Sequence, residues 1–212
     1  MSQLKVFSFN PLQVNAYLLY EPDGSGILID ASCMDQSEFK ELQVFIDKNH
    51  ISLDYLVNTH GHFDHVFGVP MVKELYHPTF LMHEADGFLL HFAGEQARSF
   101  GFEFEADIPL PDGYLKDNDC VTAGSIRLRV IHVPGHSQGG VAFYEESEGR
   151  LFSGDTLFAG GIGRTDLPGG NYDQIISSIK MKLMILPDVT KVYPGHGPSS
   201  TIGKEKSGNP FL

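Results

Sequence analysis

Side chains of types that can bind metal ions are concentrated in one short segment of the chain, Thr59-His60-Gly61-His62-Phe63-Asp64-His65. Its three histidines and one aspartate fall within six consecutive residues. They cannot all share one face of a strand or a helix, because side chains repeat about every 2 residues in a strand and about every 3.6 in a helix. A tight loop, which Gly61 makes easier, can direct all of them at one centre. The pattern therefore favours a metal site over a surface loop that happens to be polar.

Three later segments place a histidine or an aspartate after a glycine at the end of an apolar run. They are Val133-Pro134-Gly135-His136, Ser153-Gly154-Asp155 and Tyr193-Pro194-Gly195-His196. A structural histidine or a turn aspartate would explain any one of them by itself. Together with the first segment they predict a single site at the edge of a sheet, where strands end and loops begin.

The predicted ligands are five imidazoles and two carboxylates. Such nitrogen and oxygen donors suit zinc, iron or manganese better than calcium or magnesium. Seven ligands exceed what one tetrahedral ion can use, so we expect two divalent ions, with zinc as the expected metal and iron or manganese as alternatives. The set is His60, His62, Asp64, His65, His136, Asp155 and His196. The remaining histidines are predicted to be surface or core residues: His50, His77, His83, His91 and His132.

Apolar patterning predicts short strands and amphipathic helices along the whole chain. Residues 85–118 mix glycine, phenylalanine and acidic residues, and we expect a short helix and a long surface loop there that can act as a lid. No low-complexity linker divides residues 1–212, which favours a single domain of α/β (α+β) class with two sheets and helices outside. Strands are predicted at Leu4–Phe9, Val14–Tyr20, Gly26–Asp30, Leu53–Asn58, Thr79–His83, Ser125–Val133, Val141–Glu145, Arg150–Ser153 and Val189–Tyr193, and helices at Asp35–Asn49, Val69–Tyr76 and Tyr172–Met184.

Composition limits the partners and the compartment. The formal net charge of −12 disfavours nucleic acid, which needs a basic face, whereas bound metal cations would still allow a small anionic substrate. No apolar run is long enough to cross a bilayer, and the first residues do not have the pattern of a signal peptide. Cys33 and Cys120 are predicted to be free buried thiols, which fits a cytoplasmic protein. Nothing in the sequence indicates an oligomeric state.

The order HxHxDH, then His, Asp and His, resembles the signature of the metallo-β-lactamase superfamily. The resemblance implies a four-layer αβ/βα sandwich with the metal site at one edge. It also implies that metal one is held by His60, His62 and His136, that metal two is held by Asp64, His65 and His196, and that Asp155 bridges them.

Details narrow the choice within this superfamily. The commonest true β-lactamases carry Cys where Asp155 stands, flavin-linked di-iron reductases carry Glu at the position of His62, and the nucleases have a further domain. By contrast, residues 154–158, 163–166 and 194–197 are similar to the glyoxalase II (hydroxyacylglutathione hydrolase) branch. The ending, residues 200–205 with Asn209-Pro210-Phe211, resembles its short bacterial members, which lack the C-terminal helical domain that holds glutathione.

The resemblance implies hydrolysis of S-acyl glutathione-type thioesters by a hydroxide held between two metal ions. Asp64 and Asp155 would serve in catalysis. Arg164 would contact a substrate carboxylate or form an ion pair with Asp166. The alternatives are a persulfide dioxygenase with one iron on His60, His136 and Asp155, and another ester or lactone hydrolase of the same fold.

Overall fold

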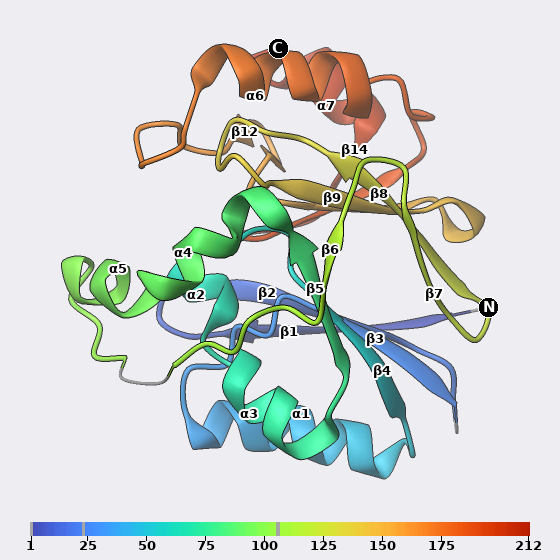
Figure 1. Ribbon diagram of the computed structural model, residues 1–212. Coiled ribbons are helices and arrows are strands. Elements are labelled where there is room, and N and C mark those ends of the chain that lie inside the picture. The colour runs from blue at the N-terminus through green and yellow to red at the C-terminus, as the bar shows by residue number, and fades with distance from the viewer. Residues whose placement is uncertain (1, 23, 105–106) are drawn as a thin grey trace.

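The computed structural model describes residues 2–22, 24–104 and 107–212 and contains two six-stranded sheets that pack face to face (Figure 1). A two-stranded hairpin, β11 (Leu157–Phe158) with β12 (Gly161–Ile162), forms a third, smaller sheet. The first sheet has the order β1 (Gln3–Phe9), β2 (Val14–Tyr20), β3 (Ser25–Ile29), β4 (Ser52–Val57), β5 (Thr79–His83), β6 (Gly113–Leu115). The second has the order β14 (Ser200–Thr201), β13 (Lys191–Pro194), β10 (Arg150–Gly154), β9 (Val141–Glu145), β8 (Ile126–His132), β7 (Cys120–Ala123).

Helices cover the outer face of each sheet (Figure 1). On the first sheet these are α1 (Gln36–Lys48) and α3 (Val69–Tyr76); on the second they are α6 (Tyr172–Ser178) and α7 (Ile202–Gly208). Three short helices lie at one edge of the sandwich: α2 (Phe63–Val66), α4 (Gly87–His91) and α5 (Ala93–Ser99). The predicted α/β fold, two central sheets flanked by helices in four layers, is confirmed.

Three apolar clusters fill the spaces between the layers. In β2, Ala16 and Leu18 pack toward the helices, whereas Tyr17 and Leu19 pack between the sheets. This alternation follows from the two-residue repeat of a strand, and burial of both faces explains why β2 has a continuous apolar run. A third cluster joins the second sheet to α6 and α7 through residues such as Ile175 and Ile202.

The predicted elements match the structure closely where the apolar pattern is regular. The helix predicted at Asp35–Asn49 is α1, and Asp35 caps it by accepting hydrogen bonds from the backbone of Ser37 and Glu38. The helix predicted at Tyr172–Met184 is α6 followed by the π-helical η3 (Ile179–Leu183). Strands β6, β7 and β14 and helix α7 were not predicted, since each is short.

The segment 85–118 differs from its prediction of one short helix and a long loop. It contains two helices, α4 and α5, after the 3-10 turn η1 (Glu84–Asp86), and it includes strand β6. Residues 105 and 106 of this segment lie outside the described residues.

One of the two cysteine predictions is wrong. Cys33 is fully buried, but Cys120 is exposed. Cys120 opens β7, the last strand of its sheet, where Val121 and Ala123 face the core and the alternate residues therefore face solvent. No disulfide pairs them.

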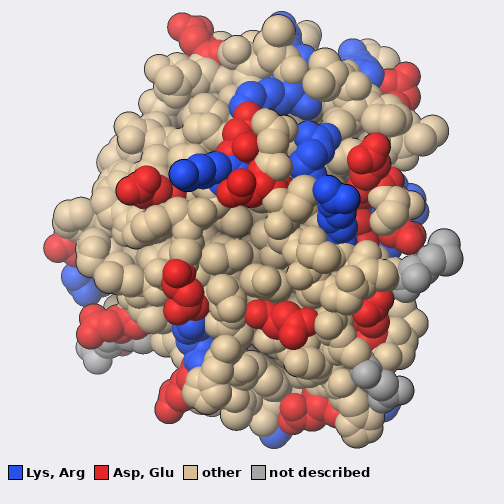
Figure 2. Space-filling model, turned by 45° about the vertical axis from the view of Figure 1, so that its right-hand side comes forward, with Lys and Arg blue, Asp and Glu red and all other residues tan. Residues whose placement is uncertain are grey.

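Basic and acidic side chains are interspersed on the face of the molecule shown in Figure 2. Among the described residues, none of the helices combines the length and the apolarity that crossing a membrane requires.

Candidate metal centre

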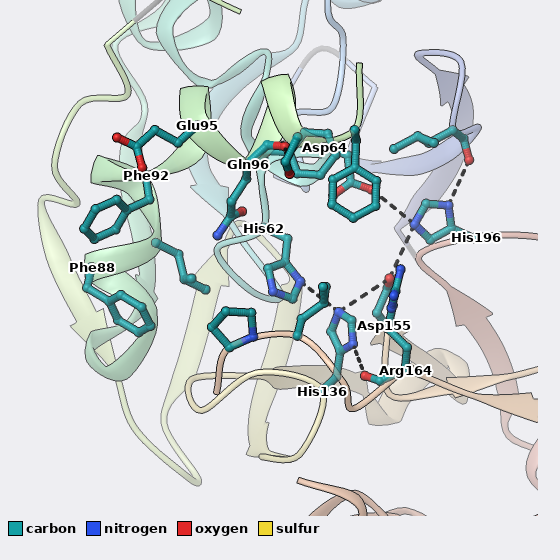
Figure 3. A pocket seen from close by; sticks show the side chains of 17 residues that line it. His62, Asp64, Phe88, Phe92, Glu95, Gln96, His136, Asp155, Arg164 and His196 are labelled. Carbon is teal, nitrogen blue, oxygen red and sulfur yellow. Dashed lines mark hydrogen bonds and ion pairs between the residues drawn. The ribbon is translucent and has the colours of Figure 1, made fainter. Parts of the chain in front are cut away.

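The seven predicted ligands meet at one edge of the sandwich, above the ends of four strands. Residues 60–65 follow β4, His136 follows β8, Asp155 follows β10 and His196 follows β13. The crossovers between parallel strands, β3 to β4 and β10 to β13, place these carboxyl ends at the same edge. Residues that lie more than a hundred positions apart in the sequence thereby become neighbours (Figure 3).

The donor atoms form groups with the spacing of metal ligands. Within each of three groups, all chosen donor atoms lie within 4.8 Å of one another. The three groups are His60, His62 and His136; Asp64, His65 and His196; and His60, His65 and Asp155. The first two are the sets that the resemblance implies for metal one and metal two.

Asp155 lies between these sets. Its Oδ1 atom is 3.4 Å from Nε2 of His65, and its Oδ2 atom is 3.4 Å from Nε2 of His196 and 3.7 Å from Nε2 of His136. One carboxylate thus faces histidines of both groups, which is the position a bridging ligand would occupy.

Four of the five histidines have their Nδ1 atoms hydrogen-bonded away from the centre. His136 donates to the backbone oxygen of Arg164 at 2.8 Å, and His196 donates to that of Leu12 at 2.9 Å. His60 lies 3.0 Å from the Thr59 hydroxyl, and His65 lies 2.9 Å from Oδ2 of Asp30. With the proton held on Nδ1, each Nε2 lone pair is left for a metal ion.

The buried polar atoms of these residues indicate that the site fits a pair of divalent cations. Nε2 of His60, Nε2 of His65 and Oδ1 of Asp155 are buried and have no hydrogen-bond partner among the described residues. Nδ1 of His62 and Nε2 of His136 lie only 2.9 Å apart. Unpaired buried polar atoms are costly, so their convergence indicates that a cation completes the site.

Without metal, the histidines of the cluster have pKa values shifted in opposite directions. The values of His60 and His62 are lowered, and those of His65 and His196 are raised. Burial, followed by repulsion from neighbouring histidines, lowers the pKa of His62 to about 3 and that of His60 well below its usual value. Burial also opposes charge on His196 and His65, but the carboxylates outweigh it. Asp155 and Asp64 raise the pKa of His196 to about 10, and the pKa of His65 lies well above its usual value.

Both carboxylates of the cluster are held ionised. Burial raises the pKa of Asp64 and of Asp155, but the charge on His65 and the hydrogen bond from His196 more than offset this effect. The net pKa of Asp64 is therefore lowered, and that of Asp155 lies well below its usual range. Without a metal, protons on His65 and His196 stand in for the cation.

Sequence reasoning missed Asp30, a supporting carboxylate behind the ligands. It follows β3 and accepts hydrogen bonds from the backbone N–H and the hydroxyl of Thr59, both at 2.7 Å, as well as from His65. The signal was available, because Asp30 ends a predicted strand as the other ligand segments do.

Asp86 is a second supporting carboxylate that the sequence did not reveal. It accepts hydrogen bonds from the backbone of Gly61 and Gly139 and from the Ser137 hydroxyl, at 3.1, 2.6 and 2.7 Å. It therefore ties the loop of His60 and His62 to the loop of His136. Burial raises its pKa despite these three bonds. No local pattern marks this residue, because its partners are distant in sequence.

Two glycines, Gly61 and Gly195, leave room for neighbouring groups to pack closely against the backbone at the site. A Cβ atom at Gly61 would lie 2.8 Å from the backbone oxygen of Asp86, and one at Gly195 would overlap the carboxylate of Asp155. Gly61 was expected to ease a tight turn, but it has no positive φ angle, so its role is to make room.

Arg164 stands at the rim of the site, and its side chain forms an ion pair. Its Nε and Nη2 atoms each donate to the Asp166 carboxylate at 2.7 Å. This is the second of the two roles considered from the sequence. Contact with a substrate carboxylate stays a prediction. The backbone oxygen of Arg164 has a separate role in orienting His136.

A cavity of about 630 Å³ opens over the cluster (Figure 3). His62, Asp64, His136, Asp155 and His196 form its floor. Much of its wall is apolar and comes from α4, α5 and two loops, and Phe88 and Phe92 lie on the side of the cavity away from the metal ligands. Helices α4 and α5 belong to the segment 85–118, for which the sequence predicts a lid, and in the structure they form one wall of the cavity.

The model of the metallo-beta-lactamase superfamily matches residues 9–196, which include every predicted ligand. The chain belongs to the metallo-β-lactamase superfamily. Members of this family bind divalent metal ions at their active sites, so the donor cluster is the candidate active site.

Relatives agree on the fold but differ in their named activities. The chain is 35% identical to hydroxyacylglutathione hydrolase GloC of Haemophilus influenzae, over 99% of this chain and 97% of that protein. The crystal structure of the B3 metallo-β-lactamase BLEG-1 superposes with a TM-score of 0.90, at 34% identity over 99% of both chains. TTHA1623, in a di-iron-bound form, gives a TM-score of 0.87 at 38% identity, covering 98% of this chain and 100% of that one.

Proposed function

We propose that this protein is a binuclear metallohydrolase that cleaves S-acyl thioesters of the hydroxyacylglutathione type. The observation that carries the proposal is the convergence of unpaired buried donor atoms on His60, His65 and Asp155, directly beneath a cavity that Asp155 itself lines. The similarity to GloC over nearly the whole of both chains supports the thioester as substrate.

The chain's own residues would bind and orient. One ion would be held by His60, His62 and His136 and the other by Asp64, His65 and His196, with Asp155 between them. When bound, two such ions lower the pKa of a coordinated water toward 7 and polarise a carbonyl, chemistry that thioester hydrolysis needs. Asp64 lines the cavity with its carboxylate ionised, so it can accept a hydrogen bond from a water molecule that approaches the substrate.

Little else is required of the protein in this reaction. A thiolate is a good leaving group, so no further acid has to protonate it. The hydrogen bonds from Nδ1 of His136 and His196 to backbone oxygens keep both rings in a fixed orientation while substrate enters.

The direct test is to count metal ions per chain in purified protein and to assay S-lactoylglutathione hydrolysis beside two other reactions. Oxygen uptake with glutathione persulfide tests the one-iron dioxygenase, and hydrolysis of a β-lactam tests the activity named for BLEG-1. We expect about two metals, zinc first with iron or manganese as substitutes, and thioester cleavage without oxygen uptake. One iron per chain with persulfide-dependent oxygen uptake, or β-lactam cleavage without thioester cleavage, would overturn the proposal.

The carrier end of the substrate gives a second test. The Arg164 guanidinium, which lines the cavity, is already paired with Asp166, so most binding energy should come from the end of the substrate that meets the metals. Shortening the glutathione moiety should then lower kcat/KM by no more than about tenfold. A loss of several orders of magnitude would reveal a carrier site in the protein.

A further inference from the structure

The wall of the cavity opposite the metal ligands is unusually apolar. Phe88 on α4, Phe92 between α4 and α5, and Phe100 after α5 all line it. These residues are 42%, 49% and 43% exposed, so the protein leaves much of their aromatic surface uncovered. Exposed aromatic groups that gather beside an active site indicate that a ligand covers them.

The apolar surface continues around the cavity. Leu12 approaches from the loop between β1 and β2, and Leu167 and Pro168 approach from the loop between β12 and α6. A ligand that reached from the metal ligands to Phe92 would therefore touch apolar side chains on more than one side.

The few charged groups of the wall do not suit glutathione, which carries two carboxylates and one ammonium. The Arg164 guanidinium lines the cavity but is held by both oxygens of Asp166. Glu95, on α5, lines the same wall and forms no ion pair within the described part of the chain. Its negative charge would repel an anionic group placed against the phenylalanines.

We propose that the acyl group of the thioester is apolar, an aliphatic chain or an aromatic ring, and that it lies against Phe88 and Phe92 while the thiol carrier extends to solvent. The inference rests on the proposed thioester hydrolysis but replaces the hydroxyacyl group of the proposed substrate with an apolar acyl group. In the reaction, water oxygen forms a bond to the acyl carbon and the carbon–sulfur bond breaks. The thiolate takes up one proton of the water and the other proton is released to solvent, so the products are an aliphatic or aromatic carboxylate and the free thiol.

The first experiment measures kcat/KM of the metal-loaded protein on acetyl, butanoyl and hexanoyl thioesters of N-acetylcysteamine, an uncharged carrier. We expect kcat/KM to rise about two- to fourfold for each added methylene, because each is transferred from water to an apolar wall. The variants Phe88→Ala and Phe92→Ala should flatten this dependence. Ile185→Ala is the matched control, since Ile185 is an apolar residue, 74% exposed, that does not line the cavity.

A binding measurement separates recognition from turnover. Acetate, butanoate and hexanoate, the products, are titrated by calorimetry into the metal-loaded protein. Affinity should rise with chain length in the natural protein and in Ile185→Ala, but much less in Phe92→Ala. Phe92 is half exposed, so its replacement is not expected to prevent folding.

The charge of Glu95 allows a further, independent test of the proposed acyl site. With N-acetylcysteamine as the common carrier, Glu95→Gln should raise kcat/KM for an acyl chain that ends in a carboxylate relative to hexanoyl by about two- to fivefold, a modest factor because Glu95 is exposed to solvent. Equal ratios in both proteins would place the acyl chain away from Glu95 and overturn the proposed acyl site.

The outcomes separate the two proposals. Thioester hydrolysis that is equal for all chain lengths, or fastest for acetyl, together with chain-independent carboxylate binding, overturns the apolar acyl site and leaves the hydrolase. A chain-length effect that Phe88→Ala and Phe92→Ala do not change places the acyl group elsewhere and also overturns it. Absence of any thioester cleavage with both metals bound overturns the proposed function itself.

Discussion

Asp30 Oδ2 lies 2.9 Å from Nδ1 of His65, and both side chains are buried. The same oxygen accepts the hydroxyl proton of Thr59, whose own oxygen lies 3.0 Å from Nδ1 of His60. One carboxylate that is not itself a predicted ligand therefore orients two of the predicted ligands.

The variant Asp30→Asn should weaken metal binding by about 10- to 100-fold, the range for supporting partners of metal ligands. An amide has a single acceptor oxygen, so one of the groups that donate to Asp30 would lose its partner, at a cost of about 1–3 kcal/mol in folding. Chelator competition measures the affinity, and thermal unfolding measures the stability. The control is Asp173→Asn, an exposed residue in the first turn of α6. Unchanged metal affinity in Asp30→Asn would refute the orienting role.

Replacing Asp155 by Asn should lower both metal content and rate. The carboxylate faces His65, His136 and His196, so losing its charge removes attraction for cations on both sides. We expect no more than about one metal per chain and a fall of at least about 100-fold in kcat, equivalent to about 2.7 kcal/mol. Asp166→Asn, which removes a nearby exposed carboxylate, should retain its metals. Full metal content and normal turnover in Asp155→Asn would exclude it from the site.

Metal binding should release protons and strengthen as pH rises. In the metal-free protein the pKa of His196 is raised to about 10, so its proton must leave before a cation can bind. His62, with a pKa of about 3, is already neutral at pH 7. Calorimetry in buffers of different ionisation enthalpy counts the protons released. We expect the first metal equivalent to release fewer protons than the second, and no release at pH 7 would contradict the raised pKa.

The same shift makes a prediction about stability without metal. A raised histidine pKa stabilises the folded state fully below the unfolded value near 6.5, and this contribution is lost as pH rises through about 10. Chelator-treated protein should therefore melt at a lower temperature at pH 10 than at pH 7. The loaded protein should show a smaller drop, because its histidines are already deprotonated. Equal drops would indicate that other groups dominate the pH dependence.

Gly195→Ala tests close approach at the centre. The added methyl would overlap the Asp155 carboxylate and press on His65, so we expect reduced metal content and activity with the fold retained. Gly208→Ala is the matched control, because nothing lies within 4 Å of a Cβ at this position in α7. Gly208→Ala should be neutral or stabilise the protein by up to about 1 kcal/mol. Normal metal content in Gly195→Ala would show that the loop can shift.

Local sequence patterns were sufficient for the regular elements and for the members of the donor cluster. The limits of α3 and β5 agree with their predictions, because an apolar face repeats clearly along each. Short β7 could not be predicted, since four residues carry too little pattern. Cys120 was misplaced for the same reason: its exposure depends on which way an unrecognised edge strand faces.

The sequence by itself determined which side chains enter the donor cluster, because ligand-type residues recur just after apolar runs from His60 to His196, and His136, Asp155 and His196 each follow a glycine. Only the tertiary structure decided what holds and surrounds them. Asp30 and Asp86 act through partners that are remote in sequence, and the Arg164 side chain is committed to Asp166. The apolar wall of Phe88 and Phe92 likewise exists only when α4 and α5 lie over the strand ends. A sequence pattern reflects the local repeat of the chain. A hydrogen bond or a cavity wall depends instead on distances between segments that only folding brings together.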